Sequence, residues 1–80
     1  MDNKLIALSS LKDGERAIVK IIDINGSEKI RLNNLGLIEN TTITALYRSF
    51  LGEPCAYLIR GTVIALRLDT TDNIYVQRIR

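Results

Sequence analysis

With 80 residues the chain is long enough for one domain at most, and it contains 46% hydrophobic residues with only one proline and five glycines. This composition is typical of a folded globular protein and excludes an extensively disordered chain. Eleven basic and nine acidic residues are scattered along the sequence and leave a net charge of only +2, which argues against a protein that binds nucleic acid through a dense basic surface.

A single cysteine, Cys55, and the absence of histidine restrict the chemistry of the chain. One cysteine cannot form an internal disulfide, so we expect a cytoplasmic location. No apolar stretch approaches the ~20 residues of a membrane-spanning helix, and the first residues lack the apolar region of a signal peptide, so any role at a membrane should be peripheral. Without the usual histidine base we expect no catalytic residues and no enzyme activity.

The N-terminal part predicts a short lead-in followed by a long strand. Leucines in residues 5–11 surround a segment that could form one turn. Residues 15–24 are rich in β-branched side chains and predict the first strand, with Ala17, Val19 and Ile21 alternating on one face. The apolar run that begins at Ile21 breaks this alternation, which indicates either a strand covered on both faces or a bulge.

Residues 27–35 predict the one substantial helix. Ser27 is a suitable N-cap, and Gly36 follows the last helical residue. At about nine residues such a helix is too short to persist alone. We therefore expect Leu32 and Leu35, which lie on one helical face, to pack against the sheet.

The remainder predicts four more strands, at residues 41–48, 55–59, 62–68 and 74–79. Asn40 can adopt a left-handed turn conformation, Arg60-Gly61 forms a tight turn, and the polar residues 69–73 precede the last strand. The total is about five strands and one helix, which is mainly β. Short strands joined by tight turns favour a small closed or nearly closed barrel.

The connection between the second and third strands is the candidate protein-interaction site. It contains Phe50, Leu51, Gly52, Glu53 and Pro54. Two large apolar side chains at a hairpin tip are costly to expose unless they pack or bind something. Two interpretations stay open: the loop folds back over the barrel mouth, or it binds a partner.

Other candidate sites have ordinary structural interpretations. Cys55 alternates with inward-facing residues and is interpreted as a buried small hydrophobe rather than a reactive thiol. Glu53, Asp69 and Asp72 lack the ligand count of a calcium loop and have no soft ligands beside them, so they are interpreted as solvated turn residues. We expect no metal site and no cofactor.

A small RNA-binding barrel is the alternative from a different functional class. Its surface would combine Arg60, Arg67, Arg78 and Arg80 with stacking tyrosines at 47, 57 or 75. Nearby acidic residues and the low net charge favour a mixed soluble surface instead, so no nucleic-acid partner is expected.

Five blocks of residues occur in a distinctive order and spacing: Leu11-x-x-Gly14-x-x-Ala17-x-Val19, Arg31-Leu32-x-x-Leu35-Gly36-Leu37, Leu51-Gly52-Glu53-Pro54, Arg60-Gly61 leading into Ile64-Ala65-Leu66-Arg67, and Ile74-x-Val76. With these blocks the chain resembles the FeoA family, ferrous iron transport protein A, from about Leu8 to Val76. The family usually continues Leu-Gly-Leu with Pro-Gly, where this chain has Glu39-Asn40, and Asn40 can occupy the left-handed position of that glycine.

The resemblance implies an SH3-like barrel with one inserted short helix, forming a single domain over residues 1–80. The family's blocks make Leu32, Leu35, Gly36, Arg60 and Gly61 structural motif residues. The SH3-like regulatory domain of metal-dependent repressors is the alternative within the same fold. Open edges of an incompletely closed barrel could also pair between copies and give weak self-association.

The same resemblance implies a function. It predicts a cytoplasmic accessory protein of bacterial ferrous iron uptake that binds FeoB, the membrane transporter with a cytosolic GTPase domain, and modulates its transport or GTPase activity. Docking is expected through the loop from Phe50 to Pro54 and the adjacent helix surface. The metal is carried by the partner, so this chain needs no metal ligands of its own.

Overall fold

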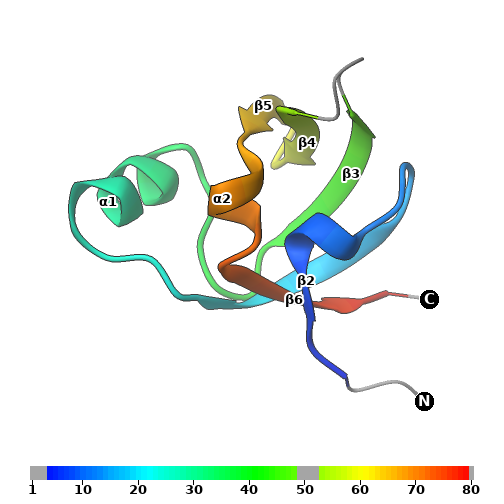
Figure 1. Cartoon of the computed structure of the whole chain (residues 1–80), viewed down its shortest axis with the longest axis horizontal. Coiled ribbons are helices and arrows are strands. Elements are labelled where there is room, and N and C mark those ends of the chain that lie inside the picture. Colours follow the sequence, from blue (N-terminus) through cyan, green and yellow to red (C-terminus); the bar gives the residue numbers. More distant parts are fainter. Residues whose placement is uncertain (1–3, 49–52, 80) are drawn as a thin grey trace.

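The computed structural model describes residues 4–48 and 53–79, which form one antiparallel sheet with short helices (Figure 1). The six strands within these residues are β1 (Ile6–Ala7), β2 (Arg16–Ile22), β3 (Thr42–Arg48), β4 (Cys55–Ile59), β5 (Thr62–Leu66) and β6 (Ile74–Arg78). They lie in the order β1-β6-β2-β3-β4-β5, and every neighbouring pair is antiparallel. The mainly β fold is confirmed.

The sheet is strongly curved and wraps around its own core (Figure 1). Alternate side chains of the strands point inward, because successive residues of a strand face opposite sides of the sheet. The inward-facing set includes Ala17, Val19, Ile43, Ala45, Tyr57, Ile59, Ile64, Leu66, Ile74 and Val76. Burying one face in this way is what allows a chain of this size to form a core.

A bulge in β2 explains the broken alternation of the first strand. The pairing of β2 with β6 shifts register between Val19 and Ile21. Beyond this point Ile22 is buried, whereas Ile21 is 46% exposed. The bulge, one of the two predicted alternatives, is confirmed. The prediction that Ile21 shares a face with Ala17 and Val19 is wrong, because the extra residue moves the following side chains to the opposite face.

The lead-in contains a sixth strand that the sequence did not predict. Ile6 and Ala7 form β1 and pair with Val76 and Tyr75 of β6. The 3-10 helix η1 (Leu8–Ser10) follows and provides the predicted turn. A strand of two residues has no periodicity to recognise, so only its pairing with β6 reveals it.

Two α-helices differ from the prediction. Helix α1 (Gly26–Asn34) begins after Asn25, so Asn25 rather than Ser27 is the N-cap. Leu32 is fully buried as predicted, but Leu35 is 38% exposed because it is the C-cap residue beyond the last helical turn. Helix α2 (Leu68–Thr71) replaces the predicted end of a strand and the first part of a turn.

Two of the predicted turns, at Asn40 and at Arg60-Gly61, are present. Asn40 has a φ of 72°, and its N–H donates a 2.7 Å hydrogen bond to the carbonyl of Val19. Arg60 and Gly61, with φ of 51° and 80°, form the two-residue turn between β4 and β5. Two successive residues with positive φ are typical of a type I′ hairpin turn, which matches the right-handed twist of the strands it joins.

Candidate functional site

The candidate interaction site predicted at Phe50 to Pro54 lies in the connection between β3 and β4. Phe50, Leu51 and Gly52 lie outside the described residues, so their part in the site stays a prediction. Glu53 is half-buried and Pro54 is exposed. The structure therefore describes how the C-terminal end of this loop is held.

Glu53 attaches the loop to α2. Its carboxylate oxygen Oε1 accepts a 2.6 Å hydrogen bond from the backbone N–H of Leu68, the first residue of α2. The first N–H groups of a helix have no partner within the helix, so a carboxylate placed there satisfies one of them with a charge-assisted bond. Glu53 is thus a helix cap 15 residues distant in sequence, and its interpretation as a solvated turn residue is wrong.

The other two turn carboxylates differ from each other. Asp72 is exposed, as predicted for a solvated residue, and it also accepts a 2.6 Å hydrogen bond from the Ser9 hydroxyl that connects the end of α2 to η1. Asp69 is exposed and lies 3.8 Å from Arg67 Nε, as expected for a solvated residue. Within residues 4–48 and 53–79, no three side chains of histidine, cysteine, aspartate or glutamate come together in a way that could hold a metal ion.

The N-terminal end of the loop is held by Arg48. Its Nη2 donates a 2.9 Å hydrogen bond to the carbonyl of Ser9, and its Nη1 donates a 3.3 Å hydrogen bond to the sulfur of Cys55. Cys55 is buried, as predicted for a strand residue that faces inward. Arg48 before the loop and Glu53 after it therefore fix both ends of the loop to the same side of the barrel.

Tyr57 lies beside Cys55, and we predict that its buried phenol ionises at a higher pH than an exposed tyrosine does. Burial, and then the neighbouring Cys55, raises the pKa of Tyr57 to about 12 from an ordinary value of 10.0. A folded-state pKa above the unfolded value means that Tyr57 contributes stability fully below pH 10 and that this contribution is lost as the pH rises towards 12.

The measurement is the near-ultraviolet absorbance of tyrosinate during alkaline titration, with circular dichroism to follow folding. We expect one tyrosine to ionise with a midpoint of about 12, and Tyr57→Phe to remove that step. Complete ionisation of all tyrosines near pH 10 in a chain that stays folded would contradict the buried position of Tyr57.

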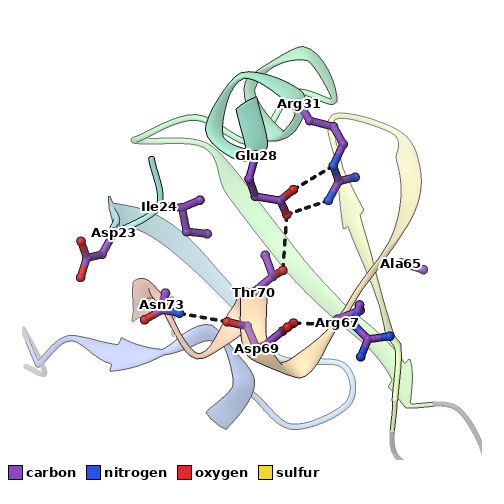
Figure 2. Close-up of a pocket in the computed structure, with 9 residues that line it drawn as sticks. All are labelled: Asp23, Ile24, Glu28, Arg31, Ala65, Arg67, Asp69, Thr70 and Asn73. Carbon is purple, nitrogen blue, oxygen red and sulfur yellow. Dashed lines mark hydrogen bonds and ion pairs between the residues drawn. The ribbon is translucent and has the colours of Figure 1, made fainter. Parts of the chain in front are cut away.

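A cleft of about 670 Å³ lies between α1, α2, the end of β2 and β5 (Figure 2). Its volume is in the range of common ligand-binding clefts, but its lining is largely polar and charged. The lining residues are Asp23, Ile24, Glu28, Arg31, Ala65, Arg67, Asp69, Thr70 and Asn73. None of them was a predicted site residue apart from Arg67 and Asp69, which the sequence placed in other candidate sites.

Glu28 connects the two helices across this cleft (Figure 2). It accepts hydrogen bonds from Arg31 Nε at 3.2 Å and Nη2 at 2.8 Å, and from the Thr70 hydroxyl at 3.5 Å. The hydrogen bonds of Arg31 lower the pKa of Glu28 below its ordinary value. The spacing of Glu28 and Arg31 on one helical face is visible in the sequence, whereas the contact with Thr70 depends on how α2 is placed.

The predicted motif residues Gly36, Arg60 and Gly61 form one structural unit. Gly36 follows α1 with a φ of 100°, a conformation that favours glycine. A Cβ at this position would lie 3.4 Å from Arg60 Cδ and 3.7 Å from Ile59 Cγ2. The Leu-Gly and Arg-Gly blocks therefore place the end of α1 against the turn between β4 and β5.

The surface required by the RNA-binding alternative is weakened by ion pairs and burial. Arg78 Nε lies 3.0 Å from Glu15 Oε2, and Arg67 lies beside Asp69. Tyr57 is buried and cannot stack on a base. Acidic neighbours and a buried aromatic ring are unfavourable for a basic stacking platform.

Together, this arrangement of strands and motif blocks corresponds to a known family. The sequence model of the FeoA domain family matches residues 6–78 of this chain. The chain belongs to the FeoA family. No curated protein sequence matches the chain.

Solved structures of FeoA proteins have the same fold. FeoA from Chlorobium tepidum is 28% identical, with a TM-score of 0.89 over 94% of this chain and 71% of that one. FeoA from Stenotrophomonas maltophilia complexed with zinc, described as a procaryotic SH3 domain protein, is 24% identical, with a TM-score of 0.75 over 94% of this chain and 96% of that one. The FeoA resemblance and the SH3-like fold are confirmed.

A manganese-dependent transcriptional repressor contains a similar fold as part of a longer chain. The repressor in complex with manganese is 18% identical, with a TM-score of 0.84 over 98% of this chain and 38% of that one. At this identity the likeness concerns the fold alone, so it supports the repressor alternative only as a shared architecture. Among the residues that the structure describes, no helix is long and apolar enough to cross a membrane.

Proposed function

We propose that this FeoA-family protein is a cytoplasmic accessory of ferrous iron uptake that binds the FeoB transporter and modulates its transport or GTPase activity. The observation that carries the proposal is the FeoA domain match over residues 6–78. The Stenotrophomonas maltophilia FeoA is described as a possible activating factor of bacterial ferrous iron transport, which supports a role beside a transporter. The protein acts by binding, peripherally to the membrane, and not by catalysis.

The loop from Phe50 to Pro54 is the proposed docking surface. Arg48 and Glu53 attach its two ends to η1 and α2. A loop with fixed ends loses less conformational entropy when a partner binds it. Phe50 and Leu51 supply the large apolar side chains that a partner pocket can bury, and such central residues commonly dominate the affinity of an interface.

The test is isothermal titration calorimetry of this protein against full-length FeoB in lipid nanodiscs and against its cytosolic GTPase domain, each with GDP or a non-hydrolysable GTP analogue. We expect saturable binding in at least one state. Replacing Phe50 and Leu51 with serine should weaken that binding at least about tenfold, as expected for interface hot spots.

Ile21→Ser is the matched control, because it removes an exposed apolar side chain from β2, outside the loop. It should leave the affinity unchanged. Absence of binding by the wild-type protein in every state would overturn the proposed function. Unchanged affinity of the double serine variant would keep the function but exclude the loop as the docking surface.

A further inference from the structure

Strand β5 is an open edge of the sheet. It pairs with β4 on one side, from Ile59↔Thr62 to Cys55↔Leu66, and it stands at the end of the strand order. Within the described residues no strand covers its other side. An open edge presents unpaired backbone groups that can bind another extended chain.

The register shows which backbone groups are free. A two-residue turn makes Ile59 and Thr62 a hydrogen-bonded pair, and such pairs alternate along an antiparallel ladder. Ile64 and Leu66 therefore bond to β4, while the N–H and C=O groups of Val63 and Ala65 point away from it. Neither Val63 nor Ala65 has a backbone or side-chain hydrogen bond on this outer side within the described residues.

The cleft adjoins this edge. Ala65 lines one side of the cleft and Arg67 follows directly after β5, while Glu28 and Arg31 of α1 face them from the opposite side (Figure 2). The volume of this cleft, about 670 Å³, leaves space beside the C-terminal half of β5. Four outward backbone groups at alternate residues match the hydrogen-bond spacing of an added peptide strand.

We propose that the edge of β5 and the adjoining cleft bind an extended segment of the transporter, which adds to the sheet as a further antiparallel or parallel strand. This inference rests on the proposed function and assigns it a second contact surface. The segment is expected to carry apolar residues next to Val63, which is 58% exposed, and a lysine or arginine near Asp23. Asp23 lines the cleft and has no side-chain ion pair or hydrogen bond within the described residues.

This edge is continuous with the proposed docking loop. Leu68 follows β5 by two residues, and its N–H is bonded to Glu53 at the end of the loop. A segment that runs along β5 therefore ends near Glu53, at the C-terminal end of the loop. We expect one partner to contact both the edge and the loop.

A second copy of the chain is the other candidate occupant. The symmetric pairing that satisfies all four groups sets Val63 of one copy opposite Ala65 of the other. Self-association through this pairing is one of the outcomes that the test distinguishes.

The experiment compares amide hydrogen exchange of the free protein with that of its complex with full-length FeoB in lipid nanodiscs, read by mass spectrometry with residue-level fragmentation. In the free protein we expect the amides of Val63 and Ala65 to exchange fast and those of Ile64 and Leu66 to exchange slowly. In the complex, Val63 and Ala65 should become protected.

Ala65→Pro removes one outward N–H, and proline is tolerated on an edge strand at such a position. It should weaken FeoB binding roughly tenfold, since a partner carbonyl loses its donor. Ala65→Ser keeps the N–H and should bind as the wild type does.

Each outcome decides between the two proposals. Strand addition is supported if the wild type binds FeoB, the amides of Val63 and Ala65 become protected in the complex, and Ala65→Pro binds FeoB more weakly. If these amides stay unprotected in the complex, or if Ala65→Pro binds FeoB as tightly as the wild type, strand addition is overturned and the proposed function is kept. If the wild type does not bind FeoB, both fail. If the Ala65→Pro variant instead abolishes self-association in sedimentation experiments while FeoB binding is unaffected, the occupant is a second copy and the proposal is wrong.

Discussion

Replacing Leu32 with alanine is expected to lower the free energy of unfolding by about 3 kcal/mol, within the range measured for leucine-to-alanine changes in protein cores. Leu32 is fully buried, and α1 is too short to be stable without the contacts of its buried face. Since small domains are stable by only about 5 to 15 kcal/mol, this one change removes a large part of the total. Urea denaturation followed by circular dichroism measures it.

Leu35→Ala is the matched control for that experiment. It removes the same atoms from a residue that is 38% exposed, so its effect should be below about 1 kcal/mol. Equal losses of stability in the two variants would contradict the orientation of α1, in which Leu32 is buried and Leu35 is partly exposed. If Leu32→Ala displaces α1, it should also weaken the hydrogen bond between Glu28 and Thr70 across the cleft.

Substituting Ile64 with proline is expected to destabilise the fold strongly, whereas Ala65→Pro should leave its stability nearly unchanged. Ile64 lies opposite Tyr57, and its N–H is expected to bond to β4 in the register given by the two-residue turn. Proline at this position removes a buried hydrogen bond and much of an apolar side chain, with an expected loss of roughly 3 to 6 kcal/mol. At Ala65 the removed N–H points outward.

Thermal unfolding of the two proline variants, together with Ile64→Ala, separates the backbone from the side-chain effect. Ile64→Ala should lose stability through its missing side chain but remain folded, because Ile64 is buried and the backbone bond stays. An Ile64→Pro variant as stable as Ile64→Ala would show that the outward groups of β5 belong to Ile64 and not to Ala65. The proposed strand-addition site would then have the wrong register.

The family's motif residues mostly build the scaffold of this protein. Gly36 and Arg60 meet where the end of α1 contacts the turn between β4 and β5. That contact holds α1 across from the edge of β5 and so shapes the cleft. The proposed partner contacts on the β5 edge therefore depend on this scaffold.

Local patterns in the sequence were sufficient for the turns and for most strands. The left-handed conformation of Asn40, the tight turn at Arg60 and Gly61, and the limits of β4 follow from residue preferences that act over a few positions. The inward position of Cys55 follows from the alternation of its strand. These features need no knowledge of what lies far away in the chain.

Only the tertiary structure decided the features that depend on distant residues. The two-residue strand β1 exists because Ile6 and Ala7 reach β6, and α2 begins at Leu68, whose first N–H is capped by Glu53. The cleft depends on Thr70 meeting Glu28, 42 residues away in sequence. The free edge of β5 is likewise a property of strand order. Each of these depends on contacts between segments that no local pattern encodes, because the entropy of closing the intervening loops is offset only when the whole core forms.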